Sequence, residues 1–204
     1  MIRNVIKIKK RNILTRARRF FLKDGKNRWD VIAELINKYG INIYAEIGIY
    51  KGGNIRRIVR RCPHVKYYLV DPYKANPNKK GGIYRHDQEH FDFLKSFVAN
   101  NIKNYDAEWM YTTSLKASKK FDDDFFDMVF IDADHSYNAV KQDIKVWLPK
   151  IKPGGIIIGH DYNNRWKNDV VKAVHEFFTK KEIHIEDDAI WWVKVTPMIK
   201  KRIL

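Results

Sequence analysis

A short acidic and glycine-rich segment carries the residue types that hold a small nucleotide-like cofactor. Glu46 lies near the end of the β-branched run 41–47, and Gly48 directly follows that run. Gly52 and Gly53 come shortly after. Glycine allows a sharp turn and lets the backbone approach a ligand without a Cβ in the way. The nicotinamide fingerprint is G-x-G-x-x-G, whereas this segment reads G-x-x-x-G-G. The spacing therefore argues against NAD as the cofactor.

Polar residues also end three predicted strands. They are Asp71; Asp132 with Asp134 and His135; and His160 with Asp161. In open α/β sheets the ligand binds outside the carboxyl ends of the strands, so we expect these side chains to converge although they are far apart in sequence. Asp71 follows the glycine turn by about 20 residues, which suits a carboxylate that accepts hydrogen bonds from a ribose diol.

The elements that must position these residues alternate along the chain. Helical spacing predicts helices at 27–40, 55–61, 89–100, 114–120, 137–148 and 168–180. Apolar runs predict strands at 41–47, 65–70, 107–112, 126–131 and within 152–161, and a closing hairpin of 183–185 with 189–195. This alternation predicts an α/β fold: a doubly wound, Rossmann-like, mostly parallel sheet with an antiparallel edge strand and helices on both faces. The polar loop 72–88 is expected on the substrate side.

Size and composition predict one domain, residues 25–204, preceded by an arm at 1–24. The 204 residues suffice for one buried core. A single cysteine, Cys62, excludes an intrachain disulfide and a cysteine-rich zinc site, and it favours a reducing cytoplasm. No run approaches the roughly 20 apolar residues of a membrane span, and the N-terminus lacks the apolar core of a signal peptide. We therefore expect a cytoplasmic location.

The arm carries a strong positive charge. The whole chain has a formal charge of +16, and no acidic residue precedes Asp24. Basic residues at near-helical spacing with isoleucine and phenylalanine describe a basic amphipathic helix. Such a helix binds a membrane surface, nucleic acid or a neighbouring subunit. If the partner is a membrane surface, the protein would be a peripheral membrane protein. The alternative is a helix packed on the domain with its basic face in solvent. Oligomeric state is not readable from the sequence.

Taken together, these motifs resemble the class I S-adenosylmethionine-dependent methyltransferases. The resemblance covers roughly residues 28–195 and includes Glu46-x-Gly48-x-x-x-Gly52, the strand end at Asp71, and Lys-Pro-Gly-Gly at 152–155. The segments Ile-Asp-Ala-Asp-His-Ser-Tyr at 131–137 and Gly-His-Asp-Tyr at 159–162 resemble small-molecule and sugar O-methyltransferases, the group related to the metal-dependent catechol, caffeoyl-CoA and macrolide-sugar enzymes.

The resemblance implies roles for the residues named above. S-adenosylmethionine would be the cofactor, held by Glu46, Gly48, Gly52, Asp71 and Asp132, with Thr113 or Ser114 near the adenine. A divalent metal would be bound by Asp132, His160 and Asp161. Relatives carry acidic or amide residues at the position of His160, and one imidazole shifts the preference from Mg²⁺ toward Mn²⁺, Fe²⁺ or Zn²⁺.

His135 follows Asp132 by three residues, where these relatives carry a catalytic Lys or His. Methyl transfer to a hydroxyl requires removal of its proton, and neutral imidazole is a suitable base near pH 7. The expected reaction is O-methylation of a small molecule or sugar. An RNA methyltransferase is the first alternative, suggested by the charge, although the Asn/Asp-Pro-Pro-Tyr segment of amino-group methyltransferases is absent. A non-catalytic binding protein of the same fold is the second.

Overall fold

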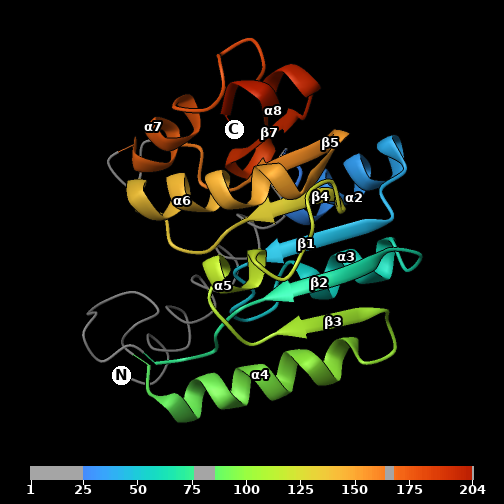
Figure 1. Ribbon diagram of the computed structural model, residues 1–204. Coiled ribbons are helices and arrows are strands. Elements are labelled where there is room, and N and C mark those ends of the chain that lie inside the picture. The colour runs from blue at the N-terminus through green and yellow to red at the C-terminus, as the bar shows by residue number, and fades with distance from the viewer. Residues whose placement is uncertain (1–24, 76–85, 164–167, 204) are drawn as a thin grey trace, which may run out of the picture.

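A computed structural model describes residues 25–75, 86–163 and 168–203, and Figure 1 shows a twisted sheet covered by helices. The basic arm at 1–24 and residues 76–85 of the predicted substrate-side loop lie outside the described residues.

Within the described residues, seven strands form one sheet in the order β3-β2-β1-β4-β5-β7-β6. Their bounds are β1 Ile43–Ile47, β2 Lys66–Val70, β3 Ala107–Met110, β4 Phe126–Ile131, β5 Ile151–Gly159, β6 His184–Glu186 and β7 Ile190–Lys194. β1 to β5 pair in parallel, and β7 runs antiparallel between β5 and β6. The predicted doubly wound sheet with an antiparallel end is therefore confirmed.

Helices cover both faces of this sheet. One face carries α2 Arg28–Tyr39, α3 Ile55–Arg61 and α4 Gln88–Ile102, and the other carries α5 Ser114–Ser118, α6 Tyr137–Trp147, α7 Asp169–His175 and α8 Pro197–Ile203. Strand residues alternate between the two cores: Tyr44 packs with the first set of helices, whereas Ala45 and Ile47 pack with the second. This alternation is the period of two that a strand buried on both sides requires.

The strand register brings the ends of four strands to one level. Ile47 of β1 pairs with Val70 of β2 and with Ile131 of β4, and Ile131 pairs with Gly159 of β5. In Figure 1 the arrowheads of β1, β2, β3 and β4 accordingly point to the same side. The residues that follow these strands must lie along a single edge of the sheet.

Two further features concern the outside of the fold. Helix α8 extends the chain beyond the predicted hairpin and was not expected from the sequence.

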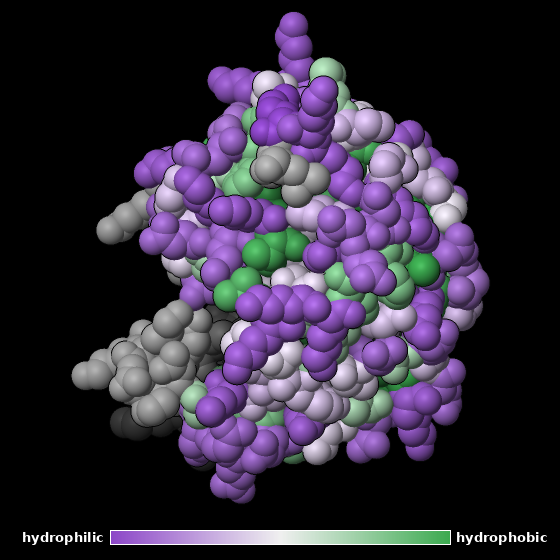
Figure 2. All heavy atoms as spheres, viewed as in Figure 1, coloured by the Kyte–Doolittle hydropathy of each residue, from purple (hydrophilic) through white to green (hydrophobic). Residues whose placement is uncertain are grey.

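Figure 2 shows a mainly hydrophilic surface over the face that carries α5, α6 and α7, with small hydrophobic areas near its middle. Among the described residues, no helix combines the length and the apolar character that a membrane crossing requires.

Candidate functional site

The glycine turn follows β1 and is held by backbone geometry. Gly48 and Gly52 have positive φ values of 94° and 62°, which confirms the sharp turn. A Cβ on Gly48 would lie 2.4 Å from the carbonyl oxygen of Asp132, and one on Gly52 would lie 2.5 Å from the side chain of Val98 on α4. Both glycines are thus required by contacts within the protein. Of the three glycines in this turn, Gly53 is the one at which a Cβ would meet no described atom within 4 Å, so its Cα side is open.

Glu46 lies buried beneath this turn and is 1% exposed. Its carboxyl accepts hydrogen bonds from the Tyr44 hydroxyl at 3.1 Å and from the Asn54 side-chain amide at 3.0 Å. Burial and the nearby negative charge of Asp132 raise the pKa of Glu46 to about 8, so this carboxyl is largely neutral at pH 7. Asn54 therefore supports Glu46 with its side chain, and although it stands at the N-cap position of α3, its side chain makes no capping hydrogen bond there.

Asp71 follows β2 and ties it to the glycine turn. One carboxylate oxygen accepts hydrogen bonds from the backbone N–H groups of Ile49 and Tyr50, at 3.0 and 2.9 Å, and the other accepts from the backbone N–H of Tyr73 at 2.7 Å. A carboxylate has about four acceptor positions, so about one remains for a ligand hydroxyl. The expected closeness of Asp71 and the glycine turn is confirmed, and the contact with a ribose stays a prediction.

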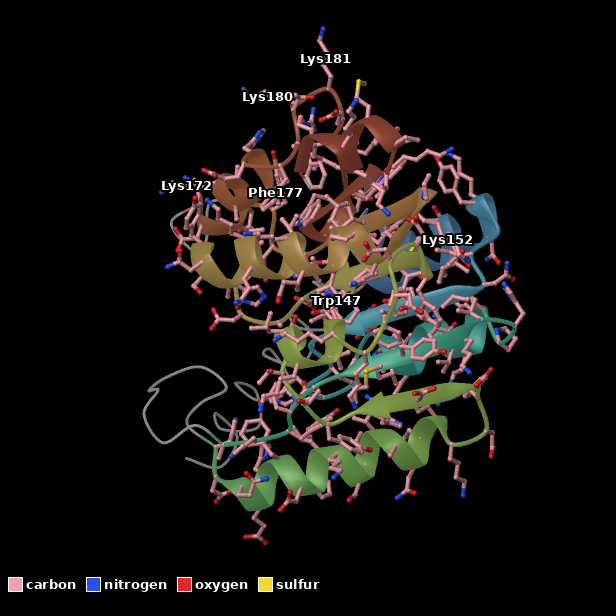
Figure 3. The ribbon with its side chains drawn as sticks, viewed as in Figure 1. Trp147, Lys152, Lys172, Phe177, Lys180 and Lys181 are labelled. Carbon is pink, nitrogen blue, oxygen red and sulfur yellow. The ribbon has the colours of Figure 1, made fainter. Side chains whose placement is uncertain are left out.

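Ser114 starts α5, close to α6. Its hydroxyl donates a hydrogen bond to Asp143 and accepts one from the indole N–H of Trp147 at 2.9 Å; Figure 3 labels Trp147 beside α5. Burial is the main cause that raises the pKa of Asp143 to about 6. The Ser114 hydroxyl thus links α5 to α6. The sequence-based prediction that Thr113 or Ser114 lies near the adenine stays a prediction; Ser114 could contact the adenine with its remaining lone pair or with its backbone.

Four side chains from the ends of β4 and β5 form a charged cluster, which comprises Asp132, His135, His160 and Asp161. The His135 Nε2 atom lies 2.9 Å from an oxygen of Asp161 and 3.3 Å from one of Asp132. The His160 Nδ1 atom lies 3.1 and 3.5 Å from the same two oxygens. The expected convergence is therefore confirmed for the residues that follow β4 and β5, whereas Asp71 contacts the glycine turn.

The charges in this cluster depend on one another. Burial lowers the pKa of both imidazoles, but their contacts with the two carboxylates outweigh it and raise each pKa to about 9. Burial likewise raises the pKa of Asp132 and Asp161, and the imidazoles outweigh it and hold both pKa values below the ordinary range. Without a bound cation, these contacts favour the charged form of both imidazoles and the ionised form of both carboxylates.

Arg28, which the sequence analysis did not single out, completes the electrostatics. Its guanidinium Nη1 lies 2.7 Å from the second oxygen of Asp132, while its backbone N–H and its Nε contact Asp188 at 3.1 and 3.4 Å. Arg28 is the first residue of α2 and is separated from Asp132 by 104 positions. No local motif marks it, because its role arises only when α2 packs beside β4 and the turn before β7.

The cluster offers a donor set for a cation. Ligand atoms of Asp132, His135 and Asp161 lie within 4.8 Å of one another. The predicted ligands Asp132, His160 and Asp161 come together as expected, and His135 joins them. A small pocket lined in part by Asp132, His135 and His160 lies at the cluster and is backed by Val140, Val170 and Trp191.

The fold has counterparts among solved structures. An O-methyltransferase from Bacillus cereus in complex with SAH aligns with a TM-score of 0.56 and 15% identity, covering 90% of this chain and 89% of that one. The O-methyltransferase TomG from Streptomyces achromogenes, involved in tomaymycin synthesis and solved with SAM, aligns with a TM-score of 0.59 and 14% identity, covering 88% and 85%. At these identities the likeness concerns the fold.

Sequence comparisons point the same way. An uncharacterized protein of Acanthamoeba polyphaga mimivirus is 25% identical over 134 residues, which is 65% of this chain and 58% of that protein. A family model described as a methyltransferase domain matches residues 45–162, from β1 through the residues that follow β5. The match spans more than half of the chain and contains the glycine turn, Asp71 and the charged cluster. The chain therefore belongs to this methyltransferase domain family.

Proposed function

We propose that this protein transfers the methyl group of S-adenosylmethionine to a hydroxyl of a small molecule or sugar. The observation that carries the proposal is the contact between its two functional regions. Gly48 of the glycine turn packs against the backbone of Asp132, the first residue of the charged cluster. A cofactor held by the turn would thus lie beside groups that can bind and orient an acceptor hydroxyl, and positioning in line is the main requirement of methyl transfer.

In this proposal the turn side holds the cofactor. Asp71 would accept from the ribose, and Gly53 would let the backbone approach the ligand. Glu46, Gly48 and Gly52 would maintain the shape of the cradle. Ser114 would lie near the adenine. The B. cereus and TomG structures were solved with SAH and SAM, and this supports the choice of cofactor.

The cluster side would handle the acceptor. Asp132, His160 and Asp161 would hold a divalent metal; the buried His160 Nδ1 atom has no partner with hydrogen-bond geometry, and this fits a missing ligand. Such an ion supplies Lewis acidity that lowers the pKa of a bound hydroxyl. His135 is the candidate proton acceptor from the sequence. It can accept a proton only as neutral imidazole, whereas its two carboxylate contacts favour the charged form.

Calorimetry with SAM and SAH tests the cofactor assignment. We expect micromolar binding to the full chain and a clear loss in Gly53→Ala, because an added Cβ there meets no described atom within 4 Å and, in this proposal, would meet the cofactor. The thermal unfolding of Gly53→Ala should match that of the wild type. Heat from neither ligand would end the proposal. Turnover with hydroxyl acceptors then separates an enzyme from a non-catalytic binding protein.

The proposal also covers the basic arm, residues 1–24, and the cellular location of the protein. We propose that the arm brings the enzyme to an anionic surface, a membrane or a nucleic acid, within the cytoplasm; the nine basic residues before Asp24 support it. Binding of vesicles and of RNA across a salt series, with and without residues 1–24, should show a steep salt dependence that deletion removes. Preference for RNA would favour the RNA methyltransferase alternative.

A further inference from the structure

Ligand atoms of Asp132, His135 and Asp161 lie within 4.8 Å of one another, and His160 faces the same two carboxylate oxygens as His135. The two imidazole nitrogens lie 2.9 to 3.5 Å from the Asp132 and Asp161 oxygens that they face. Bonds of about 2.0 to 2.2 Å to a first-row divalent ion, at tetrahedral or octahedral angles, put neighbouring ligand atoms about 2.8 to 3.6 Å apart. The observed contacts fall within that interval.

The direction of the His160 ring adds a second observation. Its Nδ1 atom is buried, and although both carboxylates lie within 3.5 Å, neither contact has hydrogen-bond geometry. Buried polar atoms in folded proteins nearly always have such a partner, so one without it calls for an explanation. An imidazole nitrogen directed between two carboxylates is what coordination by a shared cation would require, and the cation would then take the place of the proton on that nitrogen.

The backbone at Asp161 is a third observation. This residue is 7% exposed and has a φ of 59°, in the left-handed region that residues other than glycine rarely adopt. Strain of this kind persists where the surrounding structure demands it, frequently at functional sites. Here it accompanies a carboxylate that faces both imidazoles.

Arg28 limits how Asp132 can take part. The guanidinium occupies one oxygen of this carboxylate at 2.7 Å, and the other oxygen faces both imidazoles. Asp132 would therefore supply one ligand atom. The donor set becomes two imidazole nitrogens with one oxygen each from Asp132 and Asp161.

We infer that His135 and His160 both ligate the metal of the proposed methyltransferase site, which makes it a two-histidine, two-carboxylate site for a transition metal such as Mn²⁺, Fe²⁺ or Zn²⁺ rather than for Mg²⁺. Mg²⁺ favours oxygen ligands, whereas imidazole suits the transition metals. The inference rests on the proposed function for its biological meaning. It also removes His135 from the role of proton acceptor.

Pulsed EPR of the Mn²⁺-loaded full chain tests the ligand set without any turnover. We expect nuclear modulation from two directly bound imidazole nitrogens in the wild type, and the corresponding change when the chain is produced with ¹⁵N-labelled histidine. His135→Gln and His160→Gln should each remove one nitrogen and weaken Mn²⁺ binding by about tenfold or more. His64→Gln, at an exposed histidine, is the matched control and should change neither.

Competition calorimetry measures how strongly the site prefers Mn²⁺ over Mg²⁺. We expect Mn²⁺ to bind the wild type at least about tenfold more tightly than Mg²⁺. No bound nitrogen, a single nitrogen that only His160→Gln removes, or equal affinity for the two ions would overturn the inference. The isotope experiment needs no substitution, so a variant that fails to fold does not obscure the result. SAH binding is measured separately, so a failure of the proposed function would be recognised by itself.

Discussion

The glycine turn and the charged cluster lie beside each other on one edge of the sheet, but they are held in different ways. The turn depends on backbone conformation: positive φ at Gly48 and Gly52, and backbone N–H groups that donate to Asp71. The cluster depends on side-chain charge, with two carboxylates between two imidazoles and a guanidinium. We therefore expect substitutions in the turn to act mainly on stability, and substitutions around the cluster to act mainly on ion binding.

The largest effect is expected from Gly48→Ala. The new Cβ would lie 2.4 Å from a backbone oxygen of Asp132, and φ is 94°. Strain and overpacking together should lower the free energy of unfolding by about 3 to 5 kcal/mol. Urea unfolding monitored by circular dichroism measures this, with Gly53→Ala as the control that should stay within about 1 kcal/mol of wild type. Equal stability of the two variants would contradict the contact between turn and cluster.

The second largest effect is expected from Asp143→Asn, which should change how the free energy of unfolding depends on pH. The pKa of Asp143 is raised to about 6 in the folded protein from an ordinary value of 3.8, mainly by burial. Because the raised pKa belongs to an acid, ionisation opposes folding, and the wild type loses stability as pH rises from about 4 to about 6. The shift corresponds to about 3 kcal/mol.

The asparagine variant lacks this loss, so its unfolding free energy relative to wild type should improve by that order between pH 4 and pH 7.5. Urea unfolding of both proteins at several pH values is the measurement. Since Asp143 reaches the site only through Ser114, SAH affinity should change little. A constant difference between the two proteins at all pH values would show that Asp143 is not titrating in this range.

The smallest of the three effects is expected from Arg28→Met. Without the guanidinium, Asp132 loses the contact that orients its carboxylate. Partners that orient metal ligands typically contribute about 10- to 100-fold to metal affinity. Mn²⁺ affinity should fall by that factor while SAH affinity stays close to wild type. Lys26→Met, which removes an exposed pair with Glu34, is the control. A greater loss of SAH binding than of Mn²⁺ binding would mean that the two regions are not separable.

Much of this protein could be predicted from local sequence. The alternation of apolar periods predicted the sheet and its helices, because hydrophobic spacing directly reflects which faces are buried. Gly48, Asp71, Asp132 and Asp161 could be recognised because each directly follows a predicted strand or ends it, and strand ends of a parallel sheet share one edge. The family match at residues 45–162 covers this same stretch.

Other features were decided only by the tertiary structure. Arg28 lies 104 positions before Asp132, and Asp188 lies 160 positions after Arg28, so their contacts depend on how α2 packs and not on any local pattern. Likewise, the sequence placed a histidine three residues beyond Asp132, but its spacing could not tell a proton acceptor from a metal ligand. That distinction depends on where the ring nitrogen points, and the direction is set by the packing of β4 against β5, which brings Asp161 within 2.9 Å of His135.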